Sequence, residues 1–487
     1  MKECIAAYDF GTSGVKVALV TLDGQIIAVS EKGYGMLYPQ PGFVEQDPEE
    51  YWSAVCAVTR QALRQAEIDP AYVKALNFST QEWNVIPISE DGTILYNAVS
   101  WLDGRAGKQA EEINAKLGYE AVRAQSRQPH ILWFKEERPD IYEKTKYFMC
   151  CSGYLQWRAT GVMSVDRDYD GIQPYPHYDV ILKASGVDVE KVAPNVQACR
   201  HYANLDKKGA TELGLCEGTP VFGGCIDVPA AAAGAGCGQA GDAHIYLGSS
   251  GWLSTLIPER VNSVPGTYQL PSIDPSLLIY GGCCNAACLM QNWTIDRFYP
   301  AEKQEPGYFD IIEKELIQVE PGSRGLIATP WLFGEQFPIC DSNIRTTFFN
   351  VTQDHNRAYF LNAVREGICY SMLGQIRYCE SDCGLKISRL GANGGGALSD
   401  HWMQMMADIA GIPVYRAKGA RHAGAFGIGV AAMVGLGVFS FSDISKIVGV
   451  DKEFEPRKEY AAMYEDSYHR FFELYDALKN LYADCHR

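Results

Sequence analysis

The sequence has no apolar run long enough to cross a bilayer, and its basic residues are in the minority. Its 43 Lys and Arg residues are set against 59 Asp and Glu residues, which gives a formal net charge of −16. This balance disfavours nucleic acid or an anionic membrane as a general partner. Only a short apolar stretch follows Met1 to Glu3, so we expect no signal peptide, no membrane segment and a cytoplasmic protein.

Cys-x-x-Cys pairs are absent, although the chain has 16 cysteines. A zinc site at Cys283, Cys284 and Cys288 would lack a second pair of ligands nearby. Nothing in the sequence directs export, so disulfides are not expected. We interpret the cysteines as reduced and mostly buried small hydrophobic residues.

The length of the chain is sufficient for two domains. Its 487 residues exceed what one hydrophobic core usually serves, and 47% of them are apolar. We place the boundary near Gly241. This gives an N-terminal lobe of residues 1–241 and a C-terminal lobe of residues 242–487.

A turn rich in glycine and hydroxyl groups occurs once in each half of the chain. Phe10 to Gly14 reads FGTSG and Leu247 to Gly251 reads LGSSG, and strand-like residues flank both. Glycine permits positive φ, and successive N–H groups in such a turn form an anion-binding nest. Further donors are the hydroxyls of Thr12, Ser13, Ser249 and Ser250. One such turn is usually an ordinary hairpin, but two copies indicate two related lobes that hold the phosphates of a nucleotide.

Two aspartates stand at the ends of predicted strands. Asp9 precedes the first glycine-rich turn, and Asp227 follows the strand Val221 to Ile226 and precedes a helix rich in Ala and Gly. The ordinary roles are an Asx turn for Asp9 and a helix N-cap for Asp227, with Pro229 just inside the helix. The functional alternative for Asp9 is to hold Mg²⁺ through water beside the phosphates. Lys16, on the second strand, either stays solvated or reaches those phosphates.

Polar and aromatic residues gather at two further loops, which follow the strands predicted at residues 73–77 and 85–89. Carboxylates and guanidinium groups bind hydroxyls, while an indole covers the apolar face of a carbon chain, so this set suits a polyhydroxylated ligand. Each residue alone could be a surface ion pair or a core tryptophan. The candidate sugar-binding residues are Gln81, Glu82, Trp83, Trp101, Asp103 and Arg105.

A third glycine-rich turn, Gly394 to Gly396, follows a strand predicted at Ile387 to Leu390 and precedes a helix predicted at Trp402 to Ala410. With no Cβ in the way, a flat base can lie against such a backbone. The pattern alone is weak, but after two phosphate hairpins it becomes the candidate adenosine site. A long helix is predicted over Asn362 to Glu380.

These motifs together resemble the FGGY carbohydrate kinases, members of the actin and hexokinase-like superfamily, over essentially the whole chain. Each motif is weak by itself, but eight in the family's order and approximate spacing are specific. The motifs are Asp9–Gly14, Ser79–Trp83, Trp101–Arg105, Gly223–Asp227, Leu247–Gly251, Pro330–Glu335, Arg365–Gly367 and Gly391–Ala397. The segments Trp101–Arg105 and Pro330–Pro338 are most similar to the members that phosphorylate ketopentoses such as xylulose.

The resemblance implies an α/β fold of two ribonuclease H-like lobes, with ATP and sugar bound in a cleft between them. It implies transfer of the γ-phosphoryl group of MgATP to a sugar hydroxyl, with Asp227 as the base and with Asp9 and Asp227 holding Mg²⁺. The helix that begins at Asp227 would add positive potential. The ATP-binding residues expected are Gly11, Thr12, Ser13, Lys16, Gly248, Ser249, Ser250, Gly394, Gly395, Gly396 and Ser399.

The expected sugar site departs from the family patterns at three positions. Glu82 and Trp83 differ from the pairs found in the ketopentose and glycerol kinases, and Val228 stands where an amide often follows the base. An apolar Val228 suggests a substrate that is deoxy or differently oriented at one carbon. The alternatives are a polyol kinase of the glycerol or erythritol type and an ATP-binding sensor without catalysis. The expected partners are a small sugar and ATP, and homodimer formation is left open.

Overall fold

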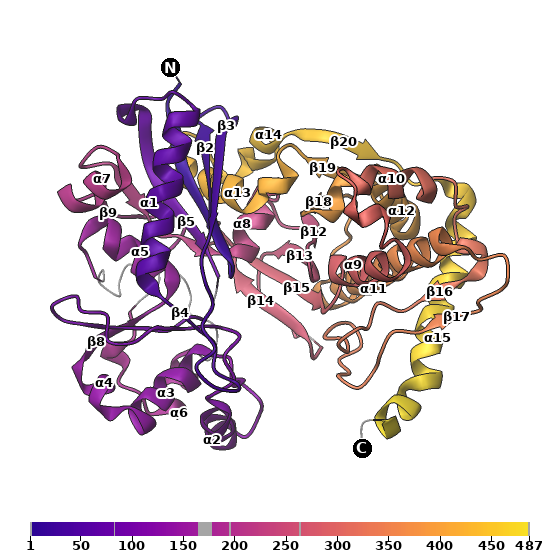
Figure 1. Ribbon diagram of the computed structural model, residues 1–487, viewed down its shortest axis with the longest axis horizontal. Coiled ribbons are helices and arrows are strands. Elements are labelled where there is room, and N and C mark those ends of the chain that lie inside the picture. Colours follow the sequence, from indigo (N-terminus) through magenta and orange to yellow (C-terminus); the bar gives the residue numbers. More distant parts are fainter. Residues whose placement is uncertain (1, 82, 164–177, 194–195, 263, 486–487) are drawn as a thin grey trace. The chain divides into compact units, whose positions relative to one another are not determined.

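The computed structural model describes residues 2–81, 83–163, 178–193, 196–262 and 264–485. They form two compact mixed α/β units (Figure 1). Unit 1 comprises Met1–Gly234, Ile273–Pro275 and Gly424–Phe441, and unit 2 comprises Ala235–Ser272, Ser276–Ala423 and Ser442–Arg487. The division into two units rests on which residues pack together. It does not test the functions assigned to the lobes 1–241 and 242–487, which stay a prediction.

Unit 1 is built on a mixed sheet in the order β3-β2-β1-β5-β10-β9, with β11 also paired to β5. Strands β1, β2 and β3 form an antiparallel meander at the N-terminal end of the described chain. Its strands are β1 (Cys4–Phe10), β2 (Gly14–Thr21), β3 (Ile26–Gly33), β5 (Val73–Thr80), β9 (His201–Asn204), β10 (Pro220–Phe222) and β11 (Cys225–Ile226).

Helix α1 (Pro48–Gln65) covers one face of this sheet, against β2 and β3. The Asp47 side chain accepts from the N–H of Glu49 at 2.8 Å, and Pro48 is the first helical residue, which is a common start for a helix. Other helices of unit 1 and two short strand pairs complete it. They are α2 (Gly107–Leu117), α3 (Arg127–Glu137), α4 (Pro139–Lys144), α5 (Cys151–Thr160), α6 (Tyr178–Ser185) and α7 (Lys207–Leu213), with β4 (Glu45–Gln46) paired to β7 (Ala98–Val99) and β6 (Ile86–Ser89) paired to β8 (Thr145–Met149).

Two helices rich in small residues pack backbone against backbone in unit 1. They are α8 (Asp227–Gly234) and α13 (Ala423–Gly435). A Cβ on Gly427 would lie 1.9 Å from the carbonyl oxygen of Ala230, so no larger residue fits there. The Ala and Gly composition of both segments therefore serves this close approach.

Unit 2 contains a seven-stranded sheet in the order β14-β15-β13-β12-β18-β19-β20. Its strands are β12 (Ala243–Leu247), β13 (Gly251–Ile257), β14 (Thr267–Pro271), β15 (Leu278–Cys284), β18 (Leu390–Asn393), β19 (Val414–Ala417) and β20 (Val450–Phe454). The strand predicted at Ile387 to Leu390 begins only at Leu390, because pairing with β12 and β19 starts there. A further pair, β16 (Ile327–Ala328) and β17 (Phe348–Phe349), lies outside this sheet.

Helix α11 (Arg357–Cys383) runs through the core of unit 2 and is longer at both ends than predicted. The N-cap Asn356 and the left-handed Gly384 define its limits. The other helices are α9 (Cys288–Phe298), α10 (Tyr308–Leu316), α12 (Asp400–Ala410), α14 (Ile444–Val448) and α15 (Ala461–Cys485). No helix in the described ranges is both long and apolar enough to span a bilayer.

Glu366 on α11 is a buried carboxyl group whose pKa is raised to about 7 by burial. It accepts from the N–H of Gly322 and the hydroxyl of Ser323, each at 2.8 Å. The folded state therefore binds this proton more tightly than the unfolded state, whose carboxyl titrates near its usual pKa of 4.5. The free energy of unfolding must accordingly fall as pH rises from about 5 through about 7.

We expect Glu366→Gln to remove this part of the pH dependence, because an amide mimics the protonated carboxyl group. Urea unfolding between pH 5 and pH 8 should show a shallower decline for the variant than for the wild type. Parallel curves would mean that Glu366 is ionised throughout this range.

Candidate active site

Three strands of unit 1 end side by side and carry three of the predicted site residues. In the parallel pairs of β5 with β1 and with β11, Thr80 stands opposite both Phe10 and Ile226. Asp9, Gln81 and Asp227 are therefore brought to one edge of the sheet. Ligands of α/β proteins collect at the carboxyl ends of parallel strands.

Asp227 is the first residue of α8 and is exposed, although much protein surrounds its carboxyl group. Its pKa is raised to about 6, first because that surrounding protein removes it from water and second because of the neighbouring charge of Asp9. A carboxylate with a raised pKa, accessible at a strand end, has the properties of a general base.

The Asp9 carboxyl group lies against the beginning of α13. A Cβ on Gly424 would come within 2.9 Å of Asp9 Oδ2, so only glycine leaves this carboxyl group in place. Burial raises the pKa of Asp9, and Lys16, opposite it in the β1–β2 pair, lowers it. Nothing in the sequence connects Gly424 with either aspartate, because its segment resembles an ordinary small-residue helix.

We expect Gly424→Ala to displace the Asp9 carboxyl group and so to raise the Mg²⁺ concentration needed for half-maximal activity several-fold. Helical φ and ψ suit alanine, so the effect should come from the close contact rather than from the backbone. Gly107→Ala, at the start of α2, is the matched control, since a Cβ there meets no atom within 4 Å. An unchanged Mg²⁺ requirement in Gly424→Ala would contradict the assignment of Asp9 to the metal site.

The turn Gly11–Ser13, called hairpin 1, joins β1 to β2 as predicted. It is closed by a hydrogen bond from the N–H of Gly11 to the carbonyl of Gly14 at 3.0 Å. A Cβ on Gly14 would lie 2.8 Å from the carbonyl oxygen of Lys32, so glycine is required by the neighbouring strand β3. Thr12 receives hydrogen bonds from Gln46 Nε2 on its carbonyl group and from Trp101 Nε1 on its hydroxyl group.

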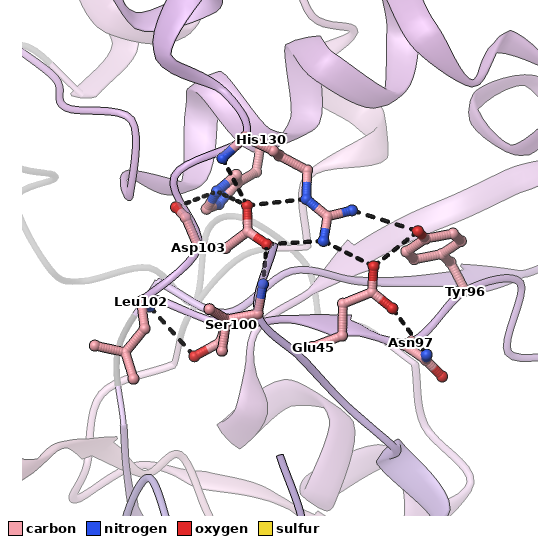
Figure 2. A network of polar contacts seen from close by, with 9 residues as sticks. Glu45, Tyr96, Asn97, Ser100, Leu102, Asp103 and His130 are labelled. Atoms are coloured by element: carbon pink, nitrogen blue, oxygen red, sulfur yellow. Dashed lines mark hydrogen bonds and ion pairs between the residues drawn. The ribbon is translucent and has the colours of Figure 1, made fainter. Parts of the chain in front are cut away.

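Asp103 and Arg105 face the protein interior, and both side chains are 0% exposed. Arg105 pairs with Asp103 and with Glu45, each at 2.7 Å, and its guanidinium lies 3.8 Å from the ring centroid of Phe43. Figure 2 shows the same cluster, in which Tyr96 and Asn97 also bond the Glu45 carboxylate.

Burial alone would raise the pKa of Asp103, but hydrogen bonds outweigh it and lower the pKa to about 2. The donors are His130, Arg105 and the backbone N–H groups of Val44 and Arg105. This carboxylate is therefore ionised at neutral pH and fully occupied by protein donors. The cluster fixes both ends of the loop that carries Trp101.

The two candidate tryptophans differ from this interior pair. Trp83 is 39% exposed and Trp101 37% exposed. Trp83 has φ of +62°, a conformation that is rare for a bulky residue and that often marks functional sites. Gln81 is nearly buried, and its Oε1 finds no donor among the residues that the structure describes. Glu82 lies outside the described residues.

In unit 2, the turn Gly248–Ser250, called hairpin 2, meets the glycine-rich turn that follows β18. The two strands β12 and β18 are parallel, with Tyr246 opposite Asn393. Gly394 has φ of +88°, and a Cβ there would lie 2.6 Å from the carbonyl oxygen of Leu247. Gly394 and Gly396 therefore pack against Leu247, the last residue of β12, which directly precedes hairpin 2.

Ser399 has a structural part in this region. Its hydroxyl group accepts from the N–H of Trp402 at the start of α12 and donates to Glu313 at 2.9 Å. Hairpin 2 itself is held by the beginning of α9, where Ala287 and Cys288 donate N–H groups to the carbonyls of Ser249 and Gly248. An ATP contact of Ser399 stays a prediction.

Gln46 and Glu45, which hold hairpin 1 and the Trp101 loop, were not predicted from the sequence. No motif signals either residue, since they form a two-residue strand whose partners come from distant segments. Glu335 was recognised only as part of a family motif. Glu335 is 3% exposed, accepts from the N–H groups of Asn285 and Gln336, and has a pKa raised by burial to about 8.

Comparison with known proteins assigns both halves of the chain to the two domains of one family. The profile of the FGGY family of carbohydrate kinases, N-terminal domain, matches residues 4–234, and that of the C-terminal domain matches residues 243–436. A xylulose kinase of Staphylococcus epidermidis is 28% identical over 99% of each chain, and a gluconokinase of Bacillus subtilis is 24% identical over 99% of this chain and 98% of its own. The crystal structure of xylulose kinase from Rhodospirillum rubrum has a similar fold, with a TM-score of 0.87, 23% identity and complete coverage of both chains.

Proposed function

The chain belongs to the FGGY family of carbohydrate kinases, and on that premise we propose that it transfers the γ-phosphoryl group of MgATP to a hydroxyl of a small ketopentose such as xylulose. One observation carries the proposal most directly. An accessible carboxyl group with a raised pKa, Asp227, stands at a strand end beside Asp9 and Gln81.

Asp227 acts as the general base. The sugar hydroxyl oxygen attacks the γ-phosphorus, the bond to the β,γ-bridging oxygen breaks, ADP leaves, and the hydroxyl proton passes to Asp227. Asp227 begins α8, so the free N–H groups of the first helical turn favour negative charge beside the reacting group. In unit 1 the N–H groups and hydroxyls of hairpin 1 contact phosphate, and in unit 2 hairpin 2 and Gly394–Gly396 contact ATP.

Asp9 and Asp227 fit Mg²⁺. They are close enough for the charge of Asp9 to raise the pKa of Asp227, a repulsion that a bound cation would relieve. The described residues contain no group of three or more His, Cys, Asp or Glu side chains able to hold a metal. Mg²⁺ commonly binds through one or two carboxylates plus phosphate oxygens and water, and when bound it neutralises phosphate charge.

The sugar lies on the exposed indoles of Trp83 and Trp101, and the unpaired Oε1 of Gln81 accepts from a sugar hydroxyl. Asp103 and Arg105 stabilise the site from the protein interior and do not contact the sugar, because their charged groups are paired within the protein. Val228 leaves one carbon of the sugar without an amide partner. A sugar lacking the hydroxyl at that carbon, or presenting it differently, therefore suits the site.

The test is ADP release from purified protein with MgATP across a panel of ketopentoses, deoxyketoses, polyols and aldonates. Release with a ketopentose or deoxyketose supports the proposal, and preference for the deoxy analogue supports the role of Val228. Release only with a polyol or an aldonate would transfer the assignment to that substrate class. ATP binding without release for any member would favour a sensor.

A further inference from the structure

Trp101 holds the hydroxyl group of Thr12, and we propose that it positions this hydroxyl as a hydrogen-bond donor to a phosphate oxygen of ATP. Trp101 Nε1 lies 3.0 Å from Thr12 Oγ1. The inference rests on the proposed function, since it takes hairpin 1 as a phosphate site. It gives Trp101 a second role, as a positioning residue, besides its contact with the sugar.

The direction of this hydrogen bond follows from chemistry. An indole nitrogen can only donate, so Thr12 Oγ1 must be the acceptor. The hydroxyl proton of Thr12 is then directed away from Trp101, and the described part of the chain offers it no acceptor. The hydroxyl is therefore left with a proton to donate, which is what an anionic phosphate oxygen requires.

Gln46 fixes the backbone of the same residue. Its Nε2 faces two carbonyl oxygens, those of Thr12 at 2.9 Å and Gly35 at 3.3 Å, which sets the orientation of the amide. Its Oε1 accepts from Tyr51 at 2.6 Å and from Gln81 Nε2 at 3.2 Å. The side chain is 0% exposed and makes every hydrogen bond that an amide can make. Thr12 is thus held at both its carbonyl and its hydroxyl group.

Both supports originate from one short strand. Glu45 and Gln46 are the two residues of β4, and they pair with Val99 and Ala98 of β7. Successive side chains of a strand point to opposite faces. Glu45 accordingly bonds Arg105, which anchors the Trp101 loop, while Gln46 reaches hairpin 1. The sugar loop and the phosphate hairpin therefore form one hydrogen-bonded assembly within unit 1.

The test is a double-mutant cycle on MgATP affinity, measured by calorimetry without sugar. Trp101→Phe retains an aromatic face but loses the N–H group, and Thr12→Val removes the hydroxyl at nearly constant volume. Each single change should weaken binding about three- to tenfold, the usual worth of one hydrogen bond. The double variant should bind no more weakly than Thr12→Val alone, because Trp101 acts through Thr12.

Two controls separate positioning from general damage. Thr12→Ser retains the hydroxyl and should remain sensitive to Trp101→Phe. Trp157→Phe makes the same chemical change on α5 and should bind MgATP as the wild type does. Additive losses in the double variant, or wild-type affinity in Trp101→Phe, would overturn the inference.

The outcome does not depend on turnover. A wild type that forms no sugar phosphate would defeat the proposed function, whereas the cycle would still report whether Trp101 acts through Thr12. A wild type that binds no MgATP would overturn the inference itself.

Discussion

Asp227→Asn is expected to retain MgATP binding, through Asp9 and the phosphate-binding turns, and to lose at least about a hundredfold in turnover. The substitution is nearly isosteric, but an amide cannot accept the proton of the sugar hydroxyl. Removal of a general base typically costs a factor of 10² to 10⁴. Rapid-quench measurement of ADP formation, with calorimetry of MgATP binding on the same preparation, separates the two effects.

Asp9→Asn provides the matched comparison for this result. Asp9 is the neighbouring carboxyl group on β1 and is assigned to Mg²⁺ rather than to proton transfer. Its replacement should raise the Mg²⁺ requirement, and added Mg²⁺ should restore part of the activity. Excess Mg²⁺ should not restore Asp227→Asn. Near-normal turnover in Asp227→Asn would refute its assignment as the base.

Arg105→Met is expected to destabilise the protein by about 3 to 5 kcal/mol, because it leaves Asp103 and Glu45 as buried carboxylates without their cation. Methionine retains much of the apolar length, so the loss reflects charge and hydrogen bonding rather than volume. The Trp101 loop depends on this cluster, and we therefore also expect a higher KM for the sugar. Urea unfolding and sugar titration measure the two consequences.

The chain offers a matched control for this change. Arg138 and Asp140 form an ion pair of the same two-residue spacing, but their side chains are 38% and 63% exposed. Exposed pairs contribute little, so Arg138→Met should cost less than about 1 kcal/mol. Equal losses for the two variants would show that Arg105 owes its effect to something other than burial of the pair.

Much of the architecture could be predicted because its signals are local. The two glycine-rich hairpins each depend on a few adjacent residues, and both are confirmed. The N-terminal meander and the Asp47 cap of α1 have equally local signals. The two-unit α/β fold itself follows from the motif series and is likewise confirmed.

The contacts that could not be predicted join residues that are distant in the sequence. Sequence placed Asp103 and Arg105 on a ligand-facing loop, but pairing of β4 with β7 brings Glu45 to them and turns both side chains inward. The contact of Gly424 with Asp9 has the same origin, since residues 424–441 return to unit 1 from far along the chain. The residues next to each position in the sequence do not indicate either contact.

Sugar phosphorylation by this protein is decided by following the γ-phosphoryl group itself. The purified protein is incubated with MgATP and xylulose, and ADP, inorganic phosphate and sugar monophosphate are quantified by ³¹P NMR and mass spectrometry. We expect ADP and sugar monophosphate in equal amounts, with both lost in Asp227→Asn. Inorganic phosphate in place of sugar phosphate, or sugar phosphate still formed by Asp227→Asn at the wild-type rate, would contradict it.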